Sequence, residues 1–126
     1  MDCPKCNASM EPVYFEGVTV DRCTQCAGIW FDAGEYSTLR DTRGAAAIDS
    51  GNCHLGRRMD HIKHILCPRC RKPTTPRDVY NEQQIHVELC EGCNGVFLDA
   101  GEFKNPGQYA FADYFRTLIR QKPRHG

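Results

Sequence analysis

The first apolar runs along the chain are short and have the length of β-strands. Between residues 13 and 20, β-branched and aromatic residues lie on both sides of Glu16 and Gly17. This pattern predicts a hairpin whose turn uses the glycine. A further apolar run at 29–31 predicts a third short strand.

The same pattern returns in the second half of the chain. Strand-like runs at 77–80 and 85–89 flank a polar turn at 81–84, and a three-residue apolar run follows at 96–98. The chain of 126 residues therefore contains two copies of one unit, each about 40 residues long, and not one domain of uniform pattern.

The tetrapeptide Asp-Ala-Gly-Glu follows the third predicted strand in both copies, and we call it the box. We expect its aspartate, Asp32 or Asp99, to cap a helix, and its glutamate, Glu35 or Glu102, to reach back to the amide of that aspartate. The first helix is predicted over about 33–42. The Asn-Pro-Gly sequence that follows the second box is expected to break the second helix after one turn.

Helical periodicity also occurs in two segments outside the repeats. The second half of the connector 44–66 predicts an amphipathic helix. Its apolar positions are Leu55, Met59, Ile62 and Leu66. The segment 105–126 predicts a basic amphipathic C-terminal helix, which could pair two copies of the chain as a homodimer.

Cysteine pairs bracket each predicted hairpin: C-P-x-C precedes it and a second C-x-x-C follows it. Units of about 40 residues cannot bury enough apolar surface to fold without a cross-link or a metal. Four thiolates form the closed tetrahedral site of structural zinc, with iron as the minority alternative. The predicted ligands of two zinc ions are Cys3, Cys6, Cys23, Cys26, Cys67, Cys70, Cys90 and Cys93.

Details of the turns follow from the C-x-x-C spacing. Two residues between ligands leave room for a tight turn whose backbone amides point at sulfur. Gly28 and Gly95 follow the last ligand of each set by two positions. We expect these glycines to supply the positive φ angles of such turns.

Other uses of the cysteines explain the pattern less well. The N-terminal segment lacks the basic and apolar regions of a signal peptide, so we expect a reducing cytoplasmic location, where cysteine pairs hold metal more often than they form disulfides. A thioredoxin-like redox pair would need a βαβ setting, which the pattern does not show. No apolar run is long enough to span a membrane.

The motif as a whole resembles the transcription factor IIB-type zinc-ribbon family. The likeness covers residues 1–36 and 67–103, where C-P-x-C, a hairpin and C-x-x-C-x-G precede an apolar run and the box. It implies a zinc ribbon in each copy, with the eight cysteines in the ligand positions, and it suggests nucleic-acid binding. The second copy departs from the first by Phe97 in place of Trp30 and by a helix break at Pro106.

Charge gives an ambiguous indication of partners. The chain has 16 basic and 16 acidic residues, and each zinc with four thiolates adds about two negative charges to a protein of zero formal charge. This balance disfavours strong nonspecific nucleic-acid binding. The basic candidates for contacts with nucleic acid or a protein partner lie in the connector and tail: Arg57, Arg58, Arg116, Arg120, Lys122 and Arg124.

Residues outside the cages suggest few other chemistries. We expect the repeat aromatics to fill the core in preference to forming a stacking surface; they are Trp30, Phe31, Tyr36, Phe97 and Phe103. The connector also offers a candidate for a third, weaker metal site, although a free thiol and solvated histidines are the simpler explanation. Its residues would be Cys53, His54, His61 and His64.

Taken together, these patterns predict a small, metal-stabilised α+β protein. The expected parts are a first ribbon with its helix at 1–43, the connector at 44–66, a second ribbon at 67–104 and the C-terminal helix at 105–126. The expected function is that of a non-enzymatic zinc-binding adaptor that binds nucleic acid or serves transcription, without an evident small-molecule substrate or a membrane partner. The alternatives are a protein interaction module and a zinc or redox sensor that uses the cages and Cys53.

Overall fold

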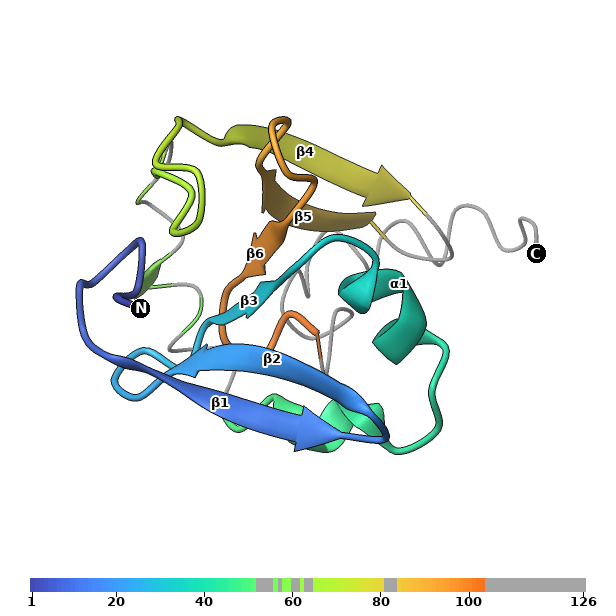
Figure 1. The fold of residues 1–126 in the computed structure, drawn as a ribbon. Coiled ribbons are helices and arrows are strands. Elements are labelled where there is room, and N and C mark those ends of the chain that lie inside the picture. The colour runs from blue at the N-terminus through green and yellow to red at the C-terminus, as the bar shows by residue number, and fades with distance from the viewer. Residues whose placement is uncertain (52–55, 57, 60–61, 63–64, 81–83, 104–126) are drawn as a thin grey trace.

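Six short strands form a single antiparallel sheet in the computed structural model of the protein (Figure 1). The structure describes residues 1–51, 56, 58–59, 62, 65–80 and 84–103. Each repeat supplies three strands, and the two sets meet in the middle of the sheet. The repeats therefore form one folded unit.

The first hairpin consists of β1 (Met10–Phe15) and β2 (Val18–Cys23). Its turn residues, Glu16 and Gly17, have φ angles of 50° and 86°. A two-residue type I′ turn requires positive φ at both positions, and glycine meets that requirement without steric cost. The predicted hairpin and the role of its glycine agree with the structure.

The second hairpin consists of β4 (Thr75–Tyr80) and β5 (Gln84–Leu89). The strands β1 and β4 form the two edges of the sheet. Each edge strand carries a proline at the equivalent repeat position, Pro12 in β1 and Pro76 in β4. Because proline has no N–H to donate, these residues discourage pairing of the edges with another strand.

The third strand of each repeat joins the two halves. β3 (Ile29–Phe31) pairs antiparallel with β6 (Val96–Leu98), which gives the strand order β1-β2-β3-β6-β5-β4. At the centre of this pairing, Trp30 lies opposite Phe97, its equivalent in the other repeat. The two repeats are thus arranged like the subunits of a two-fold dimer, with the same surface of each forming the contact.

Both faces of the central strands are buried, which explains why these runs are wholly apolar and do not alternate with polar residues. On one face, Ile29, Phe31 and Leu98 pack in a cluster with the helical segments that follow the first ribbon. On the other face, Trp30 and Phe97 pack in a second cluster with the cysteines of both repeats. The core lies between the repeats as well as within each one.

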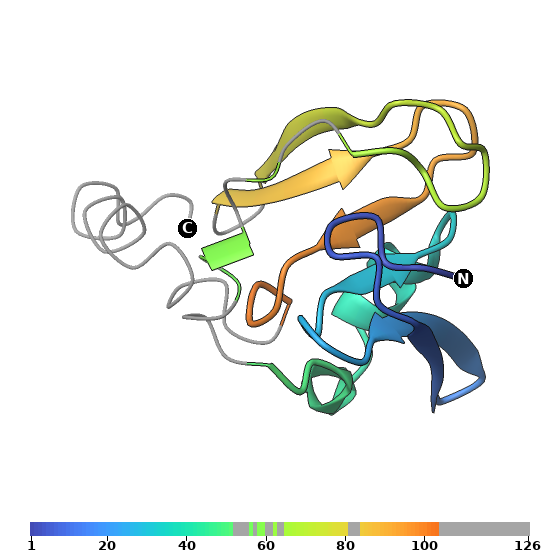
Figure 2. The same ribbon diagram turned by 90° about the vertical axis from the view of Figure 1, so that its left-hand side faces the viewer.

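Helices are shorter than the sequence predicts. α1 spans Glu35–Arg40, and its N-cap is Gly34, with φ 83° and no side-chain cap. The expected cap by Asp32 is therefore wrong, as is the expected length of the helix. A 3-10 helix, η1, follows at Ala45–Ile48 (Figures 1 and 2).

The helix predicted after the second box is absent from the part of the chain that the structure describes, because residues 101–103 form a turn. In the connector, residues 56 and 58–59 are helical, and Met59 and Ile62 pack against the cysteine-containing cluster as the periodicity predicts. The assignment of Leu66 to the apolar face is wrong, because it is 50% exposed and Ile65 is buried in its place. The predicted C-terminal helix lies outside the described residues.

Candidate metal centres

The first group of thiols lies where the N-terminal turn meets the end of β2. Cys3 and Cys6 come from the turn, Cys23 ends β2 and Cys26 precedes β3. The Sγ atoms of Cys3 and Cys26 are 3.7 Å apart, and those of Cys6 and Cys23 are 3.4 Å apart. All four sulfurs lie within 4.8 Å of one another.

The second group occupies the equivalent place in the second repeat. Cys67 and Cys70 precede β4, whereas Cys90 follows β5 and Cys93 precedes β6. The Sγ atoms of Cys67 and Cys93 are 3.7 Å apart, and the four sulfurs again lie within 4.8 Å of one another. The two groups together contain the eight cysteines that the sequence singles out as ligands.

Both groups fit a tetrahedral metal ion. With Zn–S bonds of about 2.3 Å, the sulfurs of a tetrahedral cage lie about 3.8 Å apart, close to the separations found here. All eight thiols are free of disulfides. The donor set thus fits two Zn²⁺ ions, each in a cage of four sulfurs that leaves no coordination position for a substrate.

Backbone amides point at the ligand sulfurs, as the spacing predicts. The Sγ of Cys23 accepts hydrogen bonds from the amides of Gln25 and Cys26, each at 3.3 Å. In the first C-x-x-C turn of the second repeat, the Sγ of Cys67 likewise accepts hydrogen bonds from the amides of Arg69 and Cys70, each at 3.2 Å. These bonds favour the thiolate and fix its direction toward the ion.

Each C-x-x-C turn is closed by the residue directly after its second cysteine. These four residues have φ angles between 64° and 68°; they are Asn7, Ala27, Arg71 and Asn94. The positive φ expected at Gly28 and Gly95 is therefore wrong, since the preceding residue in each turn adopts that conformation. Asparagine, which tolerates the left-handed region, occupies two of the four positions.

The thiols within each group differ in acidity. A hydrogen bond from the Cys26 thiol lowers the pKa of Cys3, and the same bond raises the pKa of Cys26. Burial opposes ionisation of Cys90, but hydrogen bonds from the backbone of Cys93 and Gly92 lower its pKa to about 7. Burial raises the pKa of Cys93 to about 12. A dication is needed for all four thiolates of a group to form together.

Comparison with known protein families agrees with this geometry. The family described as "Transcription factor zinc-finger" matches residues 2–41 and 66–105, more than half of the chain, and each match contains one four-cysteine group. The chain belongs to the transcription factor IIB-type zinc-ribbon family. Neither a curated protein nor a solved structure matches it.

The two zinc ribbons share an aromatic contact that explains their glycines. A Cβ on Gly95 would lie 2.3 Å from Cζ2 of Trp30, and a Cβ on Gly28 would lie 2.3 Å from Cζ of Phe97. The aromatic ring of each ribbon therefore covers the glycine of the other ribbon's second C-x-x-C turn. Glycine is required here for close approach.

The expected role of the repeat aromatics as core residues is confirmed. Trp30, Phe31 and Phe97 are at most 1% exposed. Tyr36 and Phe103 pack their rings against Phe31, at centroid distances of 5.5 and 5.4 Å. The aromatics therefore join the two ribbons, which the sequence pattern by itself does not reveal.

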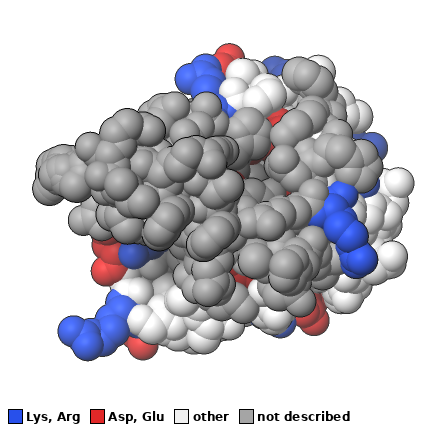
Figure 3. Space-filling view, turned by 180° about the vertical axis from the view of Figure 1, so that it is seen from behind, with Lys and Arg blue, Asp and Glu red and all other residues white. Residues whose placement is uncertain are grey.

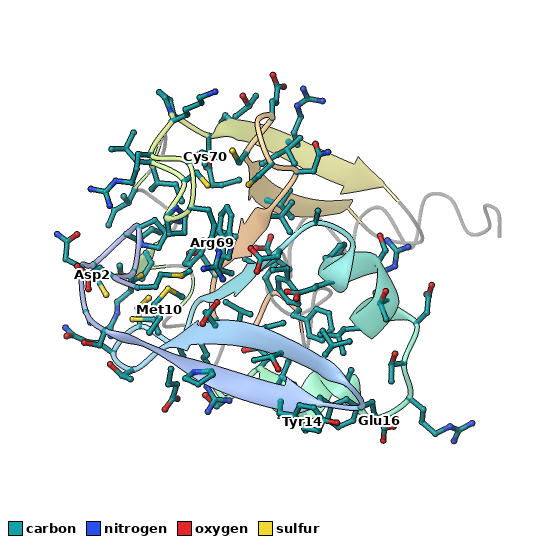
Figure 4. The ribbon with its side chains drawn as sticks, viewed as in Figure 1. Asp2, Met10, Tyr14, Glu16, Arg69 and Cys70 are labelled. Carbon is teal, nitrogen blue, oxygen red and sulfur yellow. The ribbon has the colours of Figure 1, made fainter. Side chains whose placement is uncertain are left out.

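The box aspartates also connect the ribbons. Nζ of Lys5, in the first C-P-x-C turn, lies 2.9 Å from both carboxylate oxygens of Asp99 in the second box. In the opposite direction, Nε and a terminal nitrogen of Arg69 each donate to Asp32 at 3.0 Å. Figure 4 shows Arg69 between the two halves of the sheet. The basic residue within each C-P-x-C turn thus binds the box of the other ribbon.

Capping therefore explains only part of the box. The amide of Asp32 donates to Oε1 of Glu35 at 2.8 Å, so the expected reach of Glu35 is confirmed. The Asp32 carboxylate instead accepts from the indole Nε1 of Trp30 at 3.0 Å and from Arg69. The repeated basic residue in C-P-K-C and C-P-R-C is the sequence signal for this contact.

Of the other predicted site residues, the structure describes only Arg58. The connector residues Cys53, His54, His61 and His64 lie outside the described residues. Among the described residues, the two cysteine groups are the only candidate metal clusters. Arg58 is exposed. The remaining basic candidates also lie outside the described residues: Arg57, Arg116, Arg120, Lys122 and Arg124. No helix among the described residues is long and apolar enough to cross a membrane.

Proposed function

We infer that the chain is a non-enzymatic, zinc-held binding protein that contacts the phosphate backbone of nucleic acid through the first C-x-x-C turn of its second ribbon. One observation carries this proposal. Directly after Cys70 the second ribbon exposes Arg71 and Lys72, where the first ribbon has Asn7 and Ala8. Backbone phosphates are the nucleic-acid groups that Arg and Lys contact most often.

The position of these cations supports a contact with an outside anion. Arg71 and Lys72 are both exposed, and no ion pair of either is found within the described residues. The stem of Lys72 passes the second turn of the same ribbon, with its Cδ 3.7 Å from where a Cβ of Gly92 would be. By contrast, Arg77 is paired with Glu91 and is less available.

A structural explanation for these cations is that they offset the negative charge of the neighbouring zinc-thiolate cage. The first ribbon argues against it. Its cage has the same four thiolates and the same charge, yet the equivalent positions are Asn7 and Ala8. The cage therefore does not require two cations beside it.

The expected binding is local and sensitive to salt. On the face shown in Figure 3, the described basic and acidic side chains lie in small separate groups. A site with few phosphate contacts loses affinity less steeply with salt than a long basic groove, because the slope scales with the number of phosphates neutralised.

The test replaces the two cations by the residues of the first ribbon. We expect Arg71→Asn/Lys72→Ala to weaken binding to a short single-stranded or double-stranded oligonucleotide at least about tenfold at low salt, and to reduce the salt slope by about 2. Fluorescence anisotropy at several salt concentrations measures both quantities. Arg40→Ala/Arg43→Ala removes the same charge from exposed positions of the first ribbon and serves as the matched control.

Equal losses in the two double variants would show that binding follows net charge and not this turn. Absence of oligonucleotide binding by the zinc-loaded wild type would overturn the proposal and leave a protein partner as the adaptor's target.

One observation favours a protein partner as the second candidate. Tyr14, on the edge strand β1, is 71% exposed and lies at the opposite end of the molecule from Cys70 (Figure 4). Loss of a captured partner with Tyr14→Ser, but not with Arg71→Asn/Lys72→Ala, would support it.

A further inference from the structure

We propose that the two zinc sites are coupled: Lys5 and Arg69 transmit the loading of one site to the other, so the protein takes up and releases its two zinc ions as a pair. The proposal concerns the zinc occupancy of the chain and does not depend on its partner. Two ion pairs and two aromatic contacts across the ribbons carry it.

Lys5 forms the first contact. It lies between the ligands Cys3 and Cys6, and its amide approaches the Sγ of Cys3 at 3.4 Å. Its ammonium group reaches into the second ribbon, where it binds Asp99 at 2.9 Å and lies 5.8 Å from the centroid of the Phe97 ring. The backbone that carries Lys5 is shaped by the first metal, whereas its side chain supports the box of the second ribbon.

Burial makes this contact sensitive to the shape of the turn. The side chains of Lys5 and Asp99 are 2% and 6% exposed. A buried ion pair is costly to separate, because each charge left behind has lost its water. Opening of the first turn on loss of zinc withdraws Lys5 from the Asp99 carboxylate, which is buried in the box of the second ribbon.

Arg69 forms the reciprocal contact. It lies between Cys67 and Cys70, its amide donates to the Sγ of Cys67 at 3.2 Å, and its guanidinium binds Asp32 of the first ribbon at 3.0 Å. Asp21, on β2 of the first ribbon, accepts a further bond from Arg69 at 3.0 Å. This contact is half-exposed, so its effect is expected to be weaker than that of Lys5.

The aromatic contacts act in both directions. The ring of Trp30 packs on Gly95, two residues after the ligand Cys93. The ring of Phe97 packs on Gly28, two residues after the ligand Cys26. A turn that opens when its zinc leaves disturbs the ring that rests on it. That ring belongs to the central strand of the other ribbon, so each turn is supported from the opposite site.

The experiment measures how many molecules carry no, one or two zinc ions, by native mass spectrometry of the full chain in zinc buffers. Two independent and equal sites leave about half of the molecules with one ion at half saturation, and unequal affinities raise that share. A coupling of about 100-fold, within the usual range for linked sites, lowers it to about a tenth. We expect the wild type to show this scarcity of the one-zinc form.

Four variants assign the coupling to the ion pairs. Lys5→Met/Arg69→Met should raise the one-zinc share toward half, and Lys5→Met alone should raise it more than Arg69→Met alone. Lys5→Arg/Arg69→Lys exchanges the two basic residues and keeps both charges, so its one-zinc share should stay below that of the Met double variant. Arg77→Met removes an exposed ion pair that stays within the second ribbon, so it is the matched control and should also leave the distribution unchanged.

A wild type in which half or more of the molecules carry one ion at half saturation would overturn the proposal without reference to any variant. Scarcity of the one-zinc form in both the wild type and the Met double variant would show that Lys5 and Arg69 do not couple the two sites.

Trp30 fluorescence, followed during zinc titration, provides a second measurement. It should change in step with loading of both sites, because Trp30 belongs to one ribbon and rests on the other.

Discussion

The indole of Trp30 lies so close to the α-carbon of Gly95 that no side chain fits between them. A Cβ at Gly95 would approach Cζ2 and Cε2 of Trp30 at 2.3 and 2.9 Å. The two residues are 65 positions apart, in different ribbons, and their contact lies beside the pairing of β3 with β6. The junction between the ribbons is therefore as closely packed as the interior of a single domain.

This contact predicts that Gly95→Ala destabilises the protein by overpacking the junction. The expected loss is about 1–3 kcal/mol, because Trp30 is fully buried and has little room to move. Urea unfolding of the zinc-loaded protein, followed by Trp30 fluorescence, measures the loss. Gly92→Ala is the control in the same turn: its nearest atoms would be 3.6 Å away, so its stability should stay near wild type. Equal stability of the two variants would contradict the close packing described here.

Much of this architecture is readable from sequence because it depends on local chemistry. Each C-x-x-C pair needs only a tight turn, and the hairpin around Glu16 and Gly17 needs only a two-residue loop. The central strands at 29–31 and 96–98 also appear where predicted, since wholly apolar runs of this length suit strands that are buried on both faces.

The pairing of the two repeats could not be read in the same way. Nothing in the pattern says that Trp30 lies opposite Phe97, because register between distant strands is a tertiary property. Without that pairing, Gly28 and Gly95 look like turn residues, and Lys5 looks like a solvated side chain. A repeated residue with no local purpose, such as the cation inside each C-P-x-C, is the type of signal that an intramolecular interface leaves in a sequence.

Removal of zinc is expected to unfold the protein, since each ribbon depends on its cage for stability. Cys23→Ser should lower the zinc content below two ions per chain and reduce the β-sheet signal in circular dichroism. Cys53→Ser is the matched control, because Cys53 belongs to neither four-cysteine group. It should keep two ions and wild-type stability. A loss of zinc in the Cys53→Ser variant would place the ninth cysteine in a metal site.

The pH dependence of stability should report on Glu35. Burial raises the pKa of this carboxyl, and the amide of Asp32 opposes the shift by donating to it. A raised pKa means that folding favours the protonated carboxyl. The contribution of Glu35 to the free energy of unfolding is therefore fully present below the ordinary pKa and is lost as the pH rises through the raised pKa. Wild type should therefore lose stability relative to Glu35→Gln over the pH range just above the ordinary value for glutamate. Thermal unfolding of the two proteins between about pH 5 and pH 8 measures the difference. A constant difference would show that Glu35 does not titrate in this range.

Asp49 ties the segment after η1 to the second box. Its side chain is 2% exposed, and its Oδ1 accepts a hydrogen bond from the amide of Gly101 at 3.0 Å. Gly101 has φ 83° and occupies the same position in its box as Gly34 in the first. We expect Asp49→Ala to cost about 1–3 kcal/mol, because it leaves a buried N–H without an acceptor. Asp49→Asn keeps an oxygen at this position and should cost less. Urea unfolding of the zinc-loaded variants measures the free energy of unfolding of each. An equal loss for Asn and Ala would assign the effect to the charge of Asp49 and not to its bond with Gly101.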